Sequence, residues 1–390
     1  MIDLPPSTLD DVLADLRAWT AIDCGTRNKA GVDAVGALAA ARARSMGFDV
    51  VRHAMPEFGD CYTAVARGSG QGRLMLMGHL DTVYETGVCA THPWREEAGR
   101  IYAPGIADMK GGLLTGLYAM RAFAADRSRF ESITFFFNSE EEYGSPASRP
   151  LSAERAAGVD AALVYEPARA SGDIVSARKA SGDFTLAVKG FSTHAGVAPE
   201  KGVNATVELA HRIVDIASLN GLRPGVTVTP SVVRGGTAVN VVPDSASIGI
   251  DCRATDLEGV RAVEAALKAI TARTTIPGAV NTLSGGFSFP PMVKTPAVAL
   301  MAELARDAAQ ELGFSINDVA TGGASDASAL SQIVPTIDGM GPVGGNAHNA
   351  ETEYVERASL LQRIAMSVVL FGKLLAPATL ARLRAARPRA

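Results

Sequence analysis

The sequence predicts an α/β fold with a mostly parallel sheet flanked by helices, into which an α+β domain is inserted. Three observations predict it. Two uninterrupted apolar segments, 74–77 and 132–138, are typical of strands buried on both faces of a sheet. A segment of helical spacing, 109–125, lies between them, and such alternation indicates a parallel sheet. From about Arg178 onward the pattern changes to half-exposed strands and amphipathic helices.

The first domain is predicted to comprise residues 1–177 and 291–390, and the inserted domain residues 178–290. The first domain carries further predicted helices at 7–20, 32–46, 295–312 and 355–375 and strands at 161–165 and 335–338. The insertion carries predicted strands at 183–189, 225–233 and 245–253 and helices at 204–219 and 257–271. A glycine-rich segment, 68–72, lacks the third glycine of a dinucleotide fingerprint, so we interpret it as a hairpin loop.

The composition argues against several classes of protein. The 390 residues are 47% hydrophobic with a net charge of −4, which argues against nucleic acid as a main partner. We interpret the one basic run, 382–389, as a solvated tail. No membrane span or signal peptide is evident, so we expect a cytoplasmic protein with no membrane partner. The four cysteines lack C-x-x-C spacing and are predicted to be unpaired packing residues.

Acidic residues and histidines follow several predicted strands. They are His79, Asp108, the glutamates at 140–142, Glu166 and His348. Ligands of open α/β sheets gather at the carboxyl ends of strands, so these side chains are expected to converge. Two imidazoles and three or four carboxylates suit a pair of Zn²⁺-type ions with one bridging carboxylate, and one carboxylate is left to act as a base.

Each of these residues also has a simpler interpretation. A histidine at a strand end is often only a satisfied polar residue, a run of three glutamates is often a solvated face, and Asp108 could be a helix N-cap. Glu166 is harder to explain in this way, because its apolar strand places the carboxylate against the end of the sheet. His79, followed two residues later by Asp81, has the pattern of an imidazole held by a carboxylate.

The motifs and their order resemble the M20 family of metallopeptidases. The motifs are Gly-His-Leu-Asp-Thr-Val at 78–83, Gly-Ile-Ala-Asp-Met-Lys-Gly-Gly at 105–112, Glu-Glu-Tyr-Gly-Ser at 141–145 and the late His348. Segments 22–26, 191–196 and 322–327 are most similar to the glutamate carboxypeptidase branch of the family. The resemblance covers nearly the whole chain. It implies a zinc-peptidase-like catalytic domain and an inserted ferredoxin-like domain that serves for dimerisation or as a lid.

The resemblance also implies a ligand set. Asp108 would bridge two Zn²⁺ ions in each subunit, with Co²⁺ or Mn²⁺ as substitutes. His79 and Glu166 would complete one site, and Glu142 and His348 the other.

Further roles near this centre follow from the same resemblance. Glu141 would be the general base, Asp81 would orient His79, and Glu140 would be peripheral. The peptide bond after Asp108 would be cis.

Substrate-binding roles are implied for five further residues. His194 would donate to the oxyanion from the partner subunit, which implies a homodimer formed through the inserted domain. Arg253 and Asn240 would hold the carboxylate of the substrate, and Gly323 and Ser325 would offer backbone N–H groups to it. Two simpler interpretations stay open: His194 as a surface residue of a turn, and Arg253 as the ion-pair partner of a nearby aspartate.

The implied reaction is dizinc-dependent hydrolysis of an amide bond next to a free carboxylate, which releases a C-terminal amino acid from a peptide or an N-acyl amino acid. An N-acyl amino acid deacylase, a dipeptidase and a non-catalytic binding protein are the alternatives. A serine hydrolase is disfavoured, because the segment 323–327 fails the nucleophile-elbow pattern at its last position. Glutamate-releasing relatives carry an arginine where this chain has Gly285-Gly286-Phe287. Loss of that charge next to Phe287 and Phe289 would favour a less acidic or more apolar leaving amino acid.

Overall fold

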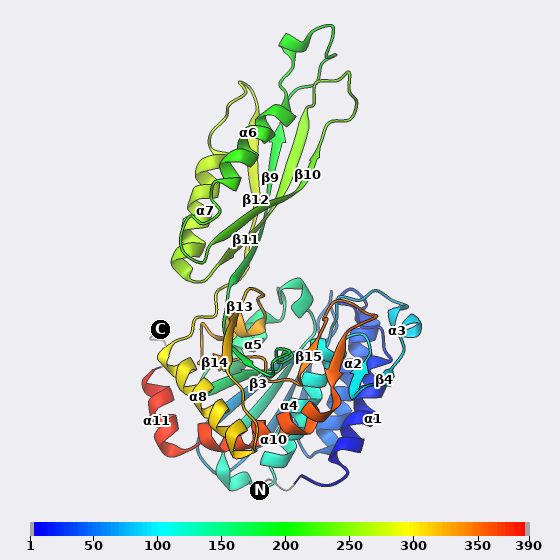
Figure 1. Cartoon of the computed structure of the whole chain (residues 1–390), viewed down its shortest axis with the longest axis vertical. Coiled ribbons are helices and arrows are strands. Elements are labelled where there is room, and N and C mark those ends of the chain that lie inside the picture. Colours follow the sequence, from blue (N-terminus) through cyan, green and yellow to red (C-terminus); the bar gives the residue numbers. More distant parts are fainter. Residues whose placement is uncertain (1–3, 387–390) are drawn as a thin grey trace. The chain divides into compact units, whose positions relative to one another are not determined.

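The computed structural model describes residues 4–386 and divides into two compact units (Figure 1). The main unit consists of Met1–Ala177, Lys294–Ala320 and Ser325–Ala390, and the inserted unit of Arg178–Val293 and Thr321–Ala324. The chain therefore leaves the main unit once for a long excursion and returns briefly to the inserted unit at 321–324.

A six-stranded sheet forms the centre of the main unit, in the order β1-β2-β6-β3-β7-β14. Strands β6, β3, β7 and β14 run parallel, and β2 and β1 extend the sheet in antiparallel pairing, so the predicted mostly parallel sheet is confirmed. The bounds are β1 Asp49–His53, β2 Cys61–Arg67, β3 Arg73–His79, β6 Ser132–Asn138, β7 Ala161–Val164 and β14 Thr336–Ile337.

The predicted hairpin at 68–72 is wrong. The segment joins β2 to β3, but β6 lies between these strands, antiparallel to β2 and parallel to β3. Turn glycines between two apolar strands are typical of a hairpin, yet β6 is apolar on both faces and pairs along both of its edges. The glycines serve close packing instead, since a Cβ on Gly68 would lie 2.3 Å from the carbonyl oxygens of Arg127 and Phe130.

Helices cover this sheet. Helix α4 packs against β3 and β6 and is contacted in turn by α1 and α10, whereas α2 packs against β1 and β2. The helices of the main unit are α1 Thr8–Thr20, α2 Lys29–Ser45, α3 Val88–Thr91, α4 Gly111–Phe123, α5 Arg149–Ala156, α8 Pro296–Glu311, α9 Asp326–Leu330, α10 Arg357–Leu374 and α11 Pro377–Ala385, with short turns η1 Ile106–Lys110, η2 Arg127–Arg129 and η3 Glu141–Tyr143. Within residues 4–386 none of the helices is by itself long and apolar enough to cross a membrane, although α10 and α11, bent by 76°, pass a test of length and composition together.

The basic run at the carboxyl end is not simply a solvated tail. Arg382 and Arg384 lie in the last turns of α11, and the Arg384 guanidinium is 2.8 Å from a carboxylate oxygen of Asp160. A buried aspartate at the start of β7 thus fixes this helix. The remaining residues of the run, 387–389, lie outside the described residues.

Two smaller sheets are formed by strands that belong neither to the six-stranded sheet nor to the sheet of the inserted unit. They are the antiparallel sheet of β15 Gly344–Gly345, β16 Tyr354–Glu356, β5 Arg100–Tyr102 and β4 Arg95–Glu97, and the pair of β13 Asp318–Thr321 with β8 Ile174–Arg178. All four cysteines are buried and unpaired, as predicted.

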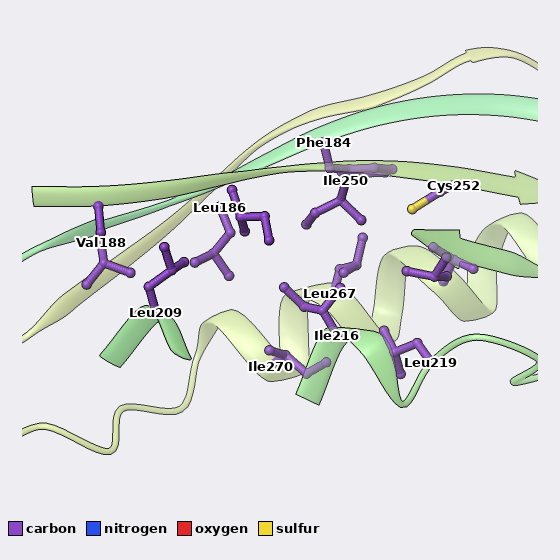
Figure 2. Packing of buried hydrophobic residues seen from close by; sticks show 14 of the residues in the cluster. Phe184, Leu186, Val188, Leu209, Ile216, Leu219, Ile250, Cys252, Leu267 and Ile270 are labelled. Carbon is purple, nitrogen blue, oxygen red and sulfur yellow. The ribbon is translucent and has the colours of Figure 1, made fainter. Parts of the chain in front are cut away.

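The inserted unit is a four-stranded antiparallel sheet with two helices on one face (Figure 2). Its elements are β9 Ala180–Lys189, β10 Thr227–Gly235, β11 Ser245–Ala254 and β12 Val280–Phe289, in the order β10-β11-β9-β12, with α6 Ala205–Ala217, α7 Leu257–Thr271 and the turn η4 Pro199–Lys201. Leu186 and Ile250 of the sheet and Leu209 and Leu267 of the helices meet in its core. Strand β12 was not predicted, because the glycine pair at 285–286 resembles a strand breaker.

Candidate metal centre

The Asp108 carboxylate lies between two imidazoles. Its Oδ1 is 3.0 Å from Nε2 of His79, and its Oδ2 is 3.3 Å from Nε2 of His348. Glu166 Oε1 lies 3.7 Å from the His79 nitrogen, and Glu142 Oε2 lies 3.7 Å from the His348 nitrogen. The five residues predicted from the sequence are thus brought together as two groups of three that share Asp108.

The parallel strands explain why these residues meet. His79 is the last residue of β3, the Glu141–Tyr143 turn follows β6, and Glu166 follows β7 by two residues, so three side chains leave the sheet at one edge. Asp108 lies in the turn before α4. The peptide bond after it is cis, as the resemblance implies, and the cap position of α4 is Lys110, so Asp108 is not an N-cap.

Asp81 connects His79 to the loop after β6. The Asp81 carbonyl oxygen is 2.9 Å from Nδ1 of His79, and a carbonyl can only accept, so this nitrogen carries the proton and Nε2 faces Asp108. The Asp81 carboxylate accepts the backbone N–H groups of Glu141 (3.1 Å) and Glu142 (3.3 Å) and the hydroxyl of Thr26 (2.7 Å). Its carboxylate is also 3.4 Å from Nδ1 of His79.

The carboxylates of the centre cannot all be charged without compensation. Burial raises the pKa of Glu141 well above its usual range, and burial together with repulsion from Asp108 raises the pKa of Glu142 to about 7. Burial acts on Asp108 in the same direction, but hydrogen bonds with His348 and His79 hold its pKa well below the usual range. Burial lowers the pKa of His79, yet its bonds to Asp108 and Asp81 outweigh burial and raise it.

These residues fit divalent cations. His79, Asp108 and Glu142 each offer a ligand atom, and these atoms lie within 4.8 Å of one another. Among the described residues, the buried Oε1 of Glu142 has no hydrogen-bond partner. Imidazole nitrogens and carboxylate oxygens are the donors of zinc-type sites, and a cation would satisfy both the unpaired oxygen and the excess of negative charge.

One buried residue that supports Asp108, Glu353, was not predicted from the sequence. Its carboxylate accepts the backbone N–H groups of Gly105 (2.9 Å), Ala107 (2.8 Å) and Asp108 (3.0 Å) and the hydroxyl of Tyr84 (2.5 Å). Glu353 is fully buried and fixes the turn that carries Asp108. The only available signal was an acidic residue close to His348, and nothing in the pattern distinguishes it from Glu351.

A second supporting group lies under the loop after β6. The buried Asp326 carboxylate accepts from the side chains of Asn138 (2.7 Å) and Ser145 (2.5 Å), which bracket this loop. Glu140 is fully buried and accepts the backbone N–H groups of Ala147 (2.9 Å) and Ser148 (2.5 Å). Glu140 therefore lies apart from the ligand set, but the solvated acidic face considered from the sequence is wrong for this residue.

The predicted substrate-binding residues belong mostly to the inserted unit. His194 is exposed, and its Nδ1 accepts the N–H of Gly196 at 3.1 Å. The carbonyl of Asn240 accepts the N–H of Ala195 in the same turn. Arg253 pairs with Asp251 at 2.6 Å, which is the simpler interpretation left open by the sequence.

The remaining two residues lie in the segment around 321–325. The Gly323 carbonyl accepts from Arg178 at 2.9 Å. The Ser325 hydroxyl is buried, donates to Asp338 at 2.6 Å and caps α9, so it is occupied structurally and has no features of a nucleophile.

Comparisons with known proteins identify the family of this chain. The sequence pattern described as Peptidase family M20/M25/M40 matches residues 75–372. Carboxypeptidase G2 from Pseudomonas sp. (strain RS-16) is 30% identical over 365 residues, which cover 92% of this chain and 88% of the relative. A succinyl-diaminopimelate desuccinylase from Leptothrix cholodnii is 28% identical and covers 92% of this chain and 95% of its own length.

Solved structures share the fold. Aminopeptidase PepT from Bacillus cereus superposes with a TM-score of 0.80 at 20% identity, over 94% of this chain and 98% of that chain. The YXEP protein of Bacillus subtilis, described as a dinuclear metal binding peptidase from the M20 family, superposes with a TM-score of 0.71 at 15% identity, over 96% and 100% of the two chains. Because the family pattern matches well over half of its residues, this chain belongs to peptidase family M20/M25/M40 and is a metal-dependent hydrolase of that family.

Proposed function

We propose that this protein hydrolyses an amide bond next to a free carboxylate, and thereby releases a C-terminal amino acid from a peptide or an N-acyl amino acid. The observation that carries the proposal is the Asp108 carboxylate, with one oxygen facing His79 and the other facing His348. A ligand shared by two cations needs this arrangement. The similarity to carboxypeptidase G2 supports the same class of reaction.

Two Zn²⁺ ions per subunit are the cofactors we propose, and Co²⁺ or Mn²⁺ would substitute. His79 and Glu166 would hold one ion, His348 and Glu142 the other, and Asp108 both. Bound there, the cations would acidify a water molecule and polarise the carbonyl of the substrate.

Glu141 moves the proton in this proposal. Its carboxylate accepts a proton from the attacking water and later delivers it to the leaving nitrogen. Burial raises the pKa of Glu141, and nearby dications would oppose that shift, which favours a base that works near neutral pH. Asp81 holds the Glu141 backbone N–H and orients His79.

His194 is the proposed donor to the oxyanion, acting from the partner subunit of a homodimer. Exposed apolar side chains on the inserted unit support a protein–protein contact there. Val207 and Val214 lie on the outer side of α6, and Val232 and Val233 lie on the edge strand β10.

The carboxylate of the substrate would bind to Arg253, Asn240 and the backbone N–H groups of Gly323 and Ser325. A guanidinium binds a carboxylate through two parallel hydrogen bonds. Since Arg253 already donates to both carboxylate oxygens of Asp251, the substrate would compete with that aspartate.

We further propose that glutamate is not the preferred leaving amino acid. By the resemblance, glutamate-releasing relatives carry an arginine where this chain has the segment 285–287. Phe287 packs edge-on against Phe184 at 5.7 Å and Phe289 is buried, so both rings belong to the packing of the sheet. The proposal therefore rests on the missing positive charge and not on an apolar contact from these rings.

The test combines metal analysis with a substrate panel. We expect about two zinc ions per chain by elemental analysis, and turnover of N-acyl amino acids, dipeptides or folate-like amides that stops when a chelator removes the metal. The panel, scored by kcat/KM, separates a carboxypeptidase from an N-acyl amino acid deacylase and a dipeptidase. Protein that stays metal-free in zinc-supplemented buffer and cleaves no amide would instead be a binding protein.

A further inference from the structure

A cavity of about 690 Å³ adjoins the candidate metal centre within the main unit. Three stretches line it, 25–28, 82–86 and 142–143, and one of the lining residues is the proposed ligand Glu142. The volume lies in the range of small-molecule binding sites. A substrate group attached to the reacting carbonyl could therefore extend into this cavity.

Among the described residues, Arg27 lines the cavity and has no ion-pair partner. Arg27 is exposed, and its Nε donates to the hydroxyl of Tyr143. Its guanidinium lies 5.1 Å from the centroid of the Tyr143 ring. In the part of the chain that the structure describes, neither terminal nitrogen of Arg27 has a hydrogen-bond or ion-pair partner, although Glu85 and Glu142 also line the cavity.

The position of Tyr143 links Arg27 to the chemistry. Tyr143 follows Glu142 directly in the turn after β6, so the residue that holds Arg27 is part of the same short turn as the proposed base and a proposed ligand. Tyr143 fixes one edge and one face of the guanidinium. This reduces the freedom that Arg27 would lose on binding an anion, and two terminal nitrogens remain to bind it.

We propose that this cavity receives the acyl group of the substrate, and that Arg27 selects acyl groups that carry a carboxylate. The inference rests on the proposed function, which assigns the carboxylate of the leaving amino acid to residues between 240 and 325. None of those residues lines this cavity, so the cavity is available to the other side of the amide bond. A carboxylate at the far end of the acyl group matches the paired donors of Arg27.

A pair of substrates that differ in one charge tests the proposal. N-succinyl and N-butyryl derivatives of the same amino acid have acyl chains of equal length, and only succinyl ends in a carboxylate. We expect Arg27→Gln to lower kcat/KM for the succinyl substrate about tenfold, mainly through KM, and to leave the butyryl substrate within about twofold. Arg44→Gln is the control, because Arg44 is an exposed arginine at the other end of α2.

Equal losses on both substrates, or no loss on either, would overturn the role of Arg27. Salt gives a second readout: the preference for succinyl should shrink as NaCl rises in the wild type and not in Arg27→Gln.

Binding to an inactive holoenzyme separates this proposal from the proposed function. In Glu141→Ala protein loaded with zinc, calorimetry should show that the N-succinyl amino acid binds about tenfold more weakly once Arg27→Gln is added. If the wild type cleaves neither amide, the proposed reaction fails while this comparison still decides about Arg27. Equal affinity, or no binding to either protein, would reject the anionic acyl group.

Discussion

The candidate metal centre and the candidate substrate-binding groups of the inserted unit are held in different ways. His79 is 1% exposed, and Asp81 and Glu353 fix the backbone around the centre through several N–H groups. In the inserted unit, His194 is exposed and Arg253 pairs with an aspartate only two residues away. The first region has a hydrogen-bonded backbone and an excess of buried carboxylates, whereas the second has a paired arginine that is half-buried and an exposed histidine.

This difference shows which ligand each region suits. Nearby cations would stabilise the charged form of buried carboxylates whose pKa is raised, and the hydrogen bonds to the backbone hold these side chains in place. The groups of the inserted unit would have to give up their local partners to bind a substrate, so each new contact contributes less binding free energy. Variants should therefore lose much more in the first region than in the second.

The largest effect is expected for Glu141→Ala. Loss of the base should lower kcat about 10³-fold and leave the zinc content unchanged, because no proposed ligand is removed. Stopped assays and elemental analysis measure the two quantities. Glu154→Ala, an exposed carboxylate on α5, is the matched control; near-normal turnover in Glu141→Ala would remove this residue from the mechanism.

The next largest effect is expected at His194. His194→Ala should lower kcat about 10²-fold without changing the metal content, as expected for loss of an oxyanion donor. Hybrids of His194→Ala with Glu141→Ala subunits decide between one chain and two. If His194 acts across the dimer, one site in each hybrid is intact and activity returns; no recovery would place it on its own subunit.

Glu353→Gln tests the rigid support of Asp108. An amide replaces one of the two acceptor oxygens with a donor that faces backbone N–H groups, so the turn before α4 should loosen. We expect zinc affinity to fall about 10- to 100-fold in a competitive chelator titration, with little change in the circular dichroism spectrum. The exposed Glu351→Gln is the control, and equal affinity in both variants would show that Glu353 does not support the site.

The smallest effect concerns Asp326. Burial raises its pKa to about 6, although the bonds from Ser145 and Asn138 oppose the shift. Because the folded pKa lies above the unfolded value, the carboxyl destabilises the fold increasingly as pH rises from about 4 to 6. Relative to wild type, Asp326→Asn should thus gain on the order of 1–2 kcal/mol in the free energy of unfolding between pH 4 and 7. Urea unfolding of chelator-treated protein measures this, and a pH-independent difference would contradict it.

The parallel sheet and the gathering of His79, Glu166 and the glutamates at 140–142 at one end of it were predictable from local pattern, whereas the choice of Glu142 among the three came from the family resemblance. Buried strands are recognised from their uninterrupted apolar segments, and the carboxyl ends of parallel strands lie at the same end of the sheet. Glu353 was not predictable in this way, since its importance arises from backbone N–H groups about 245 residues away. The position of β6 between β2 and β3 likewise depends on pairing between distant segments. The loop sequence at 68–72 is compatible with a hairpin and with the observed strand order, so it does not distinguish them.

The insertion has a consequence for how the protein is made. His79, Asp108, Glu142 and Glu166 leave the ribosome before the inserted unit, whereas His348 and Glu353 follow it, as does β14, which completes the parallel edge. Until the chain beyond the inserted unit is synthesised, a nascent chain has the proposed ligands His79, Asp108 and Glu166 but not His348. In the proposed two-cation centre, loading of both cations would therefore wait until translation has passed the inserted unit.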